Sequence, residues 1–516
     1  RLESGLYRRG HRLTPGRAAV FLRAEADHVR HDLRRGEGVK HMRIFPTSDA
    51  DSISYAENLR DFRTRGVEPH SAWPSGLARS SYWRFFADGA ELPVYDTPVT
   101  HGGPHSFVVI PFDASELTAK SIPPLRSAEI LPESLHLSGA LCGQELHFSA
   151  PEADNLLIEA NGSHLHPLAV FRANDTAAAP NPEDDSVLFL EPGIHRIRTL
   201  ELKSGQTLYL SPGAILVPEQ PDETEPVLEA HDWAGKPNYQ DFIHAEGQKS
   251  IRVCGAGIID LTALDWHARR SMVFTSCEDV SISDVIFVGA AHWTLPFFGC
   301  KNVHVDRVRM LAYRENSDGI DLVDTQHALV ENCFLRTGDD AICLKSMALT
   351  PQTGTHDILV RRCTVWNDKV RAFGVAGESR FGIHDAVFED CDVLHSMADW
   401  TTEVGALAVY ICDAAEVHHI TFRNIRIRQE SNYAICCVIT RDRWSTDREA
   451  GQVHDITFEE ITMPENYLIF LSGFSESNRL YHICFKNVST WWNSSKPAKD
   501  IFYEHLEQIK FESITE

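Results

Sequence analysis

The sequence predicts an all-β protein, in which a right-handed parallel β-helix follows an N-terminal β-sandwich. Two observations lead to this prediction. Over the second half of the chain a short strand pattern returns at intervals that suit the coils of a β-helix, without helical periodicity between its copies. Over residues 80–175, strands of alternating hydrophobicity are joined by tight-turn sequences.

The length of 516 residues, of which 43% are hydrophobic, indicates two domains or one long repetitive domain. We expect a poorly patterned, partly helical segment over residues 1–78, a β-sandwich over residues 79–180 and the β-helix over residues 181–516. Within the sandwich, Asp88-Gly89 and Asn161-Gly162 are typical of two-residue hairpin turns.

The repeat reads apolar, any, apolar, any, any, apolar, any, apolar, as in "VSISDVIF", "ALVENCFL" and "ITFRNIRI". Its third position recurs every 23 to 36 residues, at Val253, Ile282, Val305, Val330, Val360, Phe388, Phe422, Phe458 and Phe485. These intervals are too short for strand–helix–strand units and fit coils whose equivalent positions stack. Residues 202–219 are expected to form the first coil, and Cys333, Cys363 and Cys391 to share one inward ladder.

Composition excludes several classes of partner. With 49 Lys and Arg against 73 Asp and Glu, the net charge is −24, which argues against nucleic acid and anionic membranes. No apolar run is long enough for a membrane span. The 12 cysteines show no zinc-ligand spacing and look like free thiols, which leans towards the cytoplasm, or towards secretion if a leader was removed. We expect no cofactor and no metal; the sequence leaves the oligomeric state open.

Acidic residues gather in one strand-rich stretch, "ENSDGIDLVDTQHALVENCFLRTGDDAICLKS", residues 315–346. Aligning the coils places "DGIDL" beside "DAICL", and that beside "RAFGV". Asp318, Asp340 and Arg371 then form one ladder with Asp339 next to it. Adjacent strands lie about 4.8 Å apart, so the three carboxylates must crowd together.

Crowded carboxylates cannot all remain ionised at low cost, so at least one pKa must rise and leave a protonated acid beside ionised bases. Hydrolysis of a glycosidic bond requires this combination. Calcium binding by the same oxygens and a merely solvated acidic face are the alternatives.

At these residues the sequence resembles glycoside hydrolase family 28, the polygalacturonases. "ENSDGID" is similar to the Asn-Thr-Asp-Gly motif of that family, with Ser317 for Thr, and "TGDDAICLKS" is similar to its Gly-Asp-Asp motif with the following Lys345. The upstream "HWTLPFFGCKNVHVDRVRM" and "KSIRVCGAGIID" resemble earlier coils of the family. The resemblance is close over about residues 240–400, and it implies a pectin-lyase-like β-helix and an inverting hydrolase.

The resemblance also implies residue roles. Asp339 would be the general acid, and Asp318 and Asp340 would activate water. Asp321 and Lys345 would lie at the substrate-binding edge of the site.

The sequence departs from the family at two motifs. The region "KVRAFGVAGES" has no Gly-His-Gly motif, and "DWTTEVGALAVYICD" has no Arg-Ile-Lys motif, so a substrate other than plain galacturonan is expected. Arg371 could hold a uronate, Glu403 would repel one, and Trp400 is the tryptophan best placed to stack on a sugar. Trp293 is interpreted as packing and His292 as structural.

A sandwich before a β-helix resembles glycoside hydrolase family 49, the dextranases and isopullulanases. A dextranase-like hydrolase of a neutral glucan is therefore an alternative. A non-catalytic carbohydrate-binding β-helix and a calcium-dependent polysaccharide lyase are the others.

Overall fold

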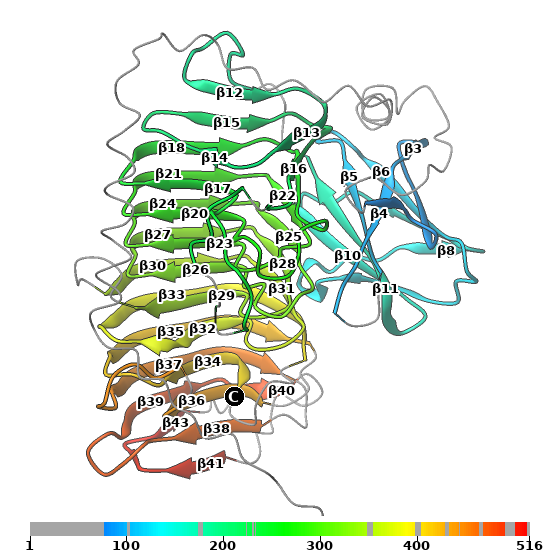
Figure 1. Ribbon diagram of the computed structural model, residues 1–516. Coiled ribbons are helices and arrows are strands. Elements are labelled where there is room, and N and C mark those ends of the chain that lie inside the picture. Colours follow the sequence, from blue (N-terminus) through cyan, green and yellow to red (C-terminus); the bar gives the residue numbers. More distant parts are fainter. Residues whose placement is uncertain are drawn as a thin grey trace, which may run out of the picture. The chain divides into compact units, whose positions relative to one another are not determined.

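The computed structural model describes residues 77–100, 104–173, 179–222, 224–229, 232, 234–347, 354–397, 404–428, 433–442, 444–463, 468–490 and 501–512. All of them belong to one unit of the chain, residues 43–516. The expected segment over residues 1–78 lies outside the described residues except for its last two. The predicted fold class is confirmed, because a two-sheet domain precedes a long parallel β-helix (Figure 1).

The N-terminal domain consists of two mainly antiparallel sheets. One sheet has the order β1 (Ala78–Arg79), β4 (Val94–Thr97), β5 (His105–Ile110), β11 (Ser163–Arg172), β10 (Asn155–Ala160) and β7 (Ala128–Leu131). The other has the order β3 (Ala90–Leu92), β2 (Trp83–Ala87), β6 (Glu116–Ser121), β9 (Glu145–Ser149) and β8 (Ala140–Cys142). A short 3-10 helix, η1 (Glu133–Leu135), follows β7.

Alternating side chains of the two sheets bury a shared core, which includes Phe85, Val108 and Leu168. The predicted hairpin turns are present. Asp88 and Gly89 have φ of 48° and 81°, and Asn161 and Gly162 have φ of 59° and 67°, as a two-residue turn of the I′ type requires.

Two faces of the β-helix form one continuous sheet. Its strands are β12 (Val187–Leu190), β13 (Gly193–Ile197), β15 (Thr207–Leu210), β16 (Ala214–Pro218), β18 (Lys249–Cys254), β19 (Ile258–Asp260), β21 (Glu278–Ser283), β22 (Ile286–Val288), β24 (Lys301–Asp306), β25 (Arg309–Leu311), β27 (Gln326–Glu331), β28 (Phe334–Thr337), β30 (Thr355–Arg361), β31 (Thr364–Asn367), β33 (Ile383–Ser396), β35 (Glu416–Ile427), β37 (Gln452–Met463), β39 (Leu480–Lys486), β40 (Ser489–Thr490), β42 (Leu506–Glu507) and β43 (Lys510–Glu512).

The third face is a separate parallel sheet, and it carries the site described below. Its strands, in order, are β14 (Leu200–Glu201), β17 (Ile243–Glu246), β20 (Met272–Thr275), β23 (Leu295–Phe298), β26 (Ile320–Val323), β29 (Ile342–Ser346), β32 (Phe373–Ser379), β34 (Gly405–Ile411), β36 (Tyr433–Ile439), β38 (Leu468–Ser472) and β41 (Ile501–Glu504).

The interior of the β-helix consists of stacked ladders of like residues. Phe388, Phe422, Phe458 and Phe485 stack with ring centroids 5.0 to 5.1 Å apart. The predicted cysteine ladder is also present, since Cys333, Cys363 and Cys391 are buried free thiols and the Cys363 amide donates to Cys391 Sγ over 3.4 Å. The expectation that residues 202–219 form the first coil is wrong. β12 pairs with β15 and β13 pairs with β16, so one more coil precedes.

Charged side chains join the β-sandwich to the β-helix. Glu159 of β10 forms an ion pair of 2.5 Å with His395 of β33, and both side chains are almost fully buried. Arg428, after β35, lies 2.7 Å from Glu133 of η1. Within the described part of the chain, no helix is long and apolar enough to span a membrane.

Candidate active site

Consecutive strands of the third sheet bring the predicted aspartates together. Asp318 lies just before β26, Asp339 and Asp340 just before β29, and Arg371 just before β32. Ile320 pairs with Ile342, and Ile342 with Phe373, so the predicted alignment of the three coils is confirmed. The Gly319 amide donates to the Asp340 carbonyl over 2.8 Å, and the Ala341 amide donates to the Arg371 carbonyl over 2.9 Å, which fixes the ladder from Asp318 through Asp340 to Arg371.

Two buried cations hold the carboxylates in place. Lys345 Nζ lies 2.8 Å from Asp318 Oδ2, 2.9 Å from Asp321 Oδ1 and 3.8 Å from Asp340 Oδ2. Arg371 Nη1 donates to Asp340 Oδ2 over 2.7 Å. Both cationic side chains are nearly buried, at 2% and 7% exposed. The cluster therefore has four carboxylates against two cations, a balance that favours retention of protons.

Asp339 is the most accessible of the three crowded aspartates, and it is half-buried. Its Oδ1 accepts the amide of Asp340 over 2.9 Å, and its Oδ2 accepts the amide of Asn316 over 3.2 Å. An oxygen of Asp339 and one each of Asp318 and Asp340 all lie within 4.8 Å of one another. The three carboxyl groups thus lie close enough together to contact the same bound group.

Burial and mutual repulsion shift the proton affinities of this cluster. Burial raises the pKa of Asp318 well above its usual value. Lys345 lowers this pKa, but burial together with the neighbouring Asp321 and Asp340 outweighs the effect of Lys345. Burial, Asp318 and Asp340 together raise the pKa of Asp339 well above its usual value. Burial raises the pKa of Asp321 to about 7. Burial lowers the pKa of Lys345, but Asp318 and Asp321 outweigh it, so the net shift is upward and the ammonium stays charged.

Two carboxylate oxygens of the crowded aspartates accept no hydrogen bond from the described residues. Asp318 Oδ1 and Asp340 Oδ1 are buried and accept no hydrogen bond from the described residues. A buried acceptor without a partner is costly unless water or a ligand supplies the donor.

Two groups of side chains could hold a metal ion by geometry. They are Asp318, Asp339 and Asp340, and Asp232, His267 and His292. In the first group, Lys345 and Arg371 already supply positive charge to Asp318 and Asp340, where calcium would otherwise do so.

The structure adds residues that the sequence interpretation did not assign to the site. Trp293 lies just before β23, and Leu295 pairs with Ile320, so Trp293 takes the ladder position next to Asp318. Lys345 Nζ lies 3.8 Å from the centroid of the Trp293 ring, as in a cation–π contact. Extending the coil alignment back by one coil would have found this tryptophan.

Of the remaining predicted site residues, the structure describes Arg371 but not Trp400 or Glu403. Arg371 reaches the cluster, where its guanidinium binds Asp340. Trp400 and Glu403 lie outside the described residues, so their expected contacts with a sugar stay predictions.

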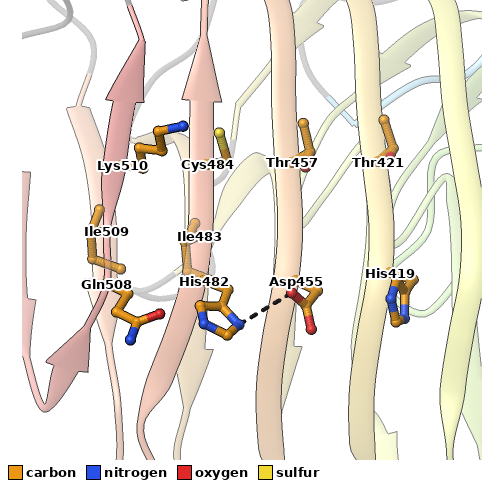
Figure 2. Close-up of a pocket in the computed structure, with 10 residues that line it drawn as sticks. All are labelled: His419, Thr421, Asp455, Thr457, His482, Ile483, Cys484, Gln508, Ile509 and Lys510. Atoms are coloured by element: carbon orange, nitrogen blue, oxygen red, sulfur yellow. Dashed lines mark ion pairs between the residues drawn. The ribbon is translucent and has the colours of Figure 1, made fainter.

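Another hollow, of about 640 Å³, lies on the outer face of β35, β37, β39 and β43 (Figure 2). The ion pair between His482 Nδ1 and Asp455 Oδ1, at 3.3 Å, crosses it, and Lys510 lies at its far side. None of the crowded aspartates lines this hollow. It has no pair of carboxylates that could act as acid and base, so the cluster around Asp339 is the better candidate.

The fold and the site define a parallel β-helix protein with a cluster of crowded, largely buried carboxylates. Residues 242–467, which include the whole cluster, match the model of "Glycosyl hydrolases family 28". A probable polygalacturonase of Vitis vinifera is 22% identical over 260 residues, which cover 46% of this chain and 53% of that protein. The chain thus spans about half the length of this relative.

Solved structures show the same fold. Polygalacturonase from Erwinia carotovora ssp. carotovora is similar with a TM-score of 0.50 and 16% identity, over 63% of this chain and 89% of that one. Dex49A from Penicillium minioluteum is similar with a TM-score of 0.53 and 13% identity, over 82% of this chain and 91% of that one. The second match extends over more of this chain, in keeping with the predicted two-domain likeness to family 49.

Proposed function

We propose that this protein is an inverting glycoside hydrolase that cleaves a polysaccharide or its oligosaccharides. The observation that carries the proposal is the pairing of unlike carboxylates. Asp339 is half-buried with a raised pKa, and one of its oxygens lies within 4.8 Å of an oxygen of Asp318 and of Asp340. Asp318 and Asp340 each have one buried oxygen that accepts no hydrogen bond from the described residues. Such a pairing supplies a proton donor and a water-activating base at neutral pH.

In the proposed reaction, Asp339 donates its proton to the glycosidic oxygen as the bond to the anomeric carbon breaks. Water held between Asp318 Oδ1 and Asp340 Oδ1 attacks that carbon and gives up its proton. Asp340, which pairs with Arg371 at 2.7 Å, takes this proton. The products are two shorter sugars; Asp339 has lost one proton and Asp340 has gained one, and exchange with solvent returns both groups to their starting states.

The crowding of the carboxylates raises a second mechanism. Inverting enzymes typically hold their two carboxyl groups about 6.5–9.5 Å apart, and retaining enzymes about 5–5.5 Å apart. Here one oxygen from each of the three carboxylates lies within 4.8 Å of the others. A retaining reaction, with Asp318 or Asp340 as nucleophile, is the second candidate. Proton NMR of the first product separates the two, since inversion and retention give opposite anomers.

The substrate class follows from the relatives and from the missing motifs. Relatives of this chain are named polygalacturonases, which supports a pectic or related glycan. The absence of the Gly-His-Gly and Arg-Ile-Lys motifs supports a substrate other than plain galacturonan. Among the described site residues, Lys345 and Arg371 are both engaged by aspartates, which leaves a dextranase-like action on a neutral glucan as the alternative.

The test is release of reducing ends from polygalacturonan, rhamnogalacturonan, dextran, pullulan, arabinan and inulin. We expect wild type to cleave one of them, and Asp339→Asn to be slower by about 10²–10⁴-fold, the usual contribution of a general acid. Asp392→Asn, which changes a carboxylate held by Arg426 far from the cluster, is the matched control and should behave as wild type.

Other outcomes would contradict the proposal. An unsaturated product that absorbs ultraviolet light would identify a lyase. Binding of a glycan without cleavage, unchanged in Asp339→Asn, would identify a non-catalytic carbohydrate-binding protein.

A further inference from the structure

A buried acid–histidine pair lies beside the candidate active site and takes no part in the proposed reaction. Asp232 Oδ2 and His267 Nδ1 are joined by a hydrogen bond, and their side chains are 6% and 0% exposed. The other oxygen of Asp232 accepts the amides of Ala234 and Lys236, over 2.8 and 2.9 Å. Burial raises the pKa of Asp232, but these amides and His267 outweigh it and hold the pKa below its usual value. Asp232 is thus an ionised acceptor, and His267 Nδ1 carries the proton between them.

This arrangement fixes which way the imidazole of His267 points. With Nδ1 donating to Asp232, Nε2 is the acceptor of the neutral ring. The Asn316 amide nitrogen lies 3.3 Å from His267 Nε2 and can donate to it. Asn316 Oδ1 accepts the indole N–H of Trp293 over 3.2 Å. The Asn316 side chain is therefore held from two sides, with its amide orientation set by both partners.

The backbone of Asn316 in turn holds the candidate general acid. Asn316 adopts a left-handed conformation, with φ of 64°, and its backbone N–H donates to Asp339 Oδ2 over 3.2 Å. The left-handed backbone conformation costs free energy for an asparagine, so the side-chain contacts of Asn316 help to hold its backbone in that conformation. The contacts run in an unbroken series from Asp232 through His267 and Asn316 to Asp339.

A metal ion between Asp232, His267 and His292 would be the rival explanation of these residues. The hydrogen bonds argue against it. His292 Nδ1 accepts the amide of Trp293 over 2.7 Å, so the neutral ring carries its proton on Nε2. This nitrogen lies 3.4 Å from Asn316 Nδ2, and because both groups are donors the two are in contact without a hydrogen bond. His267 Nδ1 is already bound to Asp232. Only one imidazole nitrogen of the two rings, His267 Nε2, then remains as a ligand atom.

We propose that Asp232 and His267 are positioning residues, which act through Asn316 to hold the proton-bearing carboxyl of Asp339 towards the bond to be cleaved. This inference rests on the proposed function. The other charges that face Asp339 are Asp318, Asp340, Lys345 and Arg371. All of them lie within or just before strands of the third sheet and should stay in place when His267 is changed.

The first test is the pH profile of His267→Ala on the glycan that wild type cleaves. A general acid must be protonated, so its pKa sets the limb where activity falls as pH rises. Release of Asn316 removes an N–H donor to the ionised form of Asp339, so that limb should move up by about one pH unit, and kcat should fall at least about tenfold with little change in KM. Asp232→Asn should move the limb in the same direction by less.

His395→Ala is the matched control, because His395 also forms a buried pair with a carboxylate, Glu159, away from the cluster. It should lower the unfolding temperature without moving the limb. If His267→Ala behaves like His395→Ala, the proposal is wrong and the pair is only structural. Stoichiometric zinc in wild type that is absent from His267→Ala would also overturn it, in favour of a metal site.

A second test needs no substrate, so it separates this inference from the proposed function. His267→Ala should destabilise the protein more at high pH, once Asp339 has lost its proton, than at low pH, where Asp339 is protonated. The excess should vanish when Asp339→Asn is also present, because no charge is then left to lose its donor. An excess that persists in the double variant would contradict the proposal, whether or not any glycan is cleaved.

Discussion

Lys345 reaches back across one coil of the β-helix and joins two aspartates that flank the start of a single strand. Its Nζ lies 2.8 Å from Asp318 Oδ2 and 2.9 Å from Asp321 Oδ1, and its side chain is 2% exposed. Lys345 pairs in register with Val323 on the neighbouring strand, so its position is set by the sheet. One ammonium group therefore holds two buried carboxyl groups in place beside the next carboxylate, Asp340.

Lys345→Met should destabilise the protein by about 3–5 kcal/mol, because it leaves buried carboxylates without their cation. Glycan cleavage should be lost as well. Thermal unfolding and reducing-end release measure the two effects. Lys249→Met, which removes an exposed pair with Glu278, is the control and should match wild type. A Lys345→Met variant as stable as wild type would show that the carboxylates are not held by this charge.

Asp321 should make stability fall as pH rises. Its pKa is about 7 in the folded chain, against a usual value of 3.8. A raised folded pKa means that the folded state binds more protons than the unfolded state between these values, so its stabilising effect is complete below about pH 4 and lost as pH rises through about 7. The upper limit of the change is about 4 kcal/mol.

The measurement is the free energy of unfolding of wild type and Asp321→Asn at several pH values from about 4 to 8. The difference between the two proteins should move in favour of Asp321→Asn as pH increases. A constant difference across this range would contradict the raised pKa.

Arg371→Met should reduce glycan cleavage by about 10- to 100-fold, which corresponds to loss of one hydrogen bond to a charged group. The guanidinium donates to Asp340 over 2.7 Å and balances the charge of the proposed base. Arg371→Lys should recover part of the activity, since it restores the charge but not the planar donor. Arg307→Met, which removes a comparable pair with Asp284 outside the site, should leave cleavage unchanged.

The coil alignment explains why so much of the site could be predicted. In a parallel β-helix, equivalent positions of successive coils stack, so one correct pairing, Ile320 with Ile342, places Asp318 beside Asp340. The same periodicity predicted the cysteine ladder. Because each coil contacts only its neighbours, the stacking of equivalent positions can be predicted without knowing the structures of the long loops.

Contacts that cross the periodicity could not be predicted. Asp232 lies 35 residues before His267 in an irregular connection, and no repeat relates the two. Asn316 joins them to Asp339 through a left-handed backbone conformation that its side-chain contacts support. The contacts of Lys345 could not be predicted either. The alternating pattern of a strand tells which face of the sheet a side chain occupies, but it does not tell which carboxylate that side chain contacts.

Gly374→Ala should force β32, the strand that follows Arg371, away from β34. Gly374 pairs with Ala408 of β34, its φ is 143°, and an added Cβ would lie 1.7 Å from the Ala408 carbonyl oxygen. Because that oxygen belongs to the backbone, β32 and β34 must move apart, and we expect a loss of at least about 4 kcal/mol in unfolding free energy. Gly89→Ala is the control for backbone strain alone, since Gly89 has φ of 81° with no atom within 4 Å of the added Cβ, and it should cost about 1–2 kcal/mol. Chemical denaturation measures both variants, and equal losses would show that β32 and β34 are not packed as closely as described.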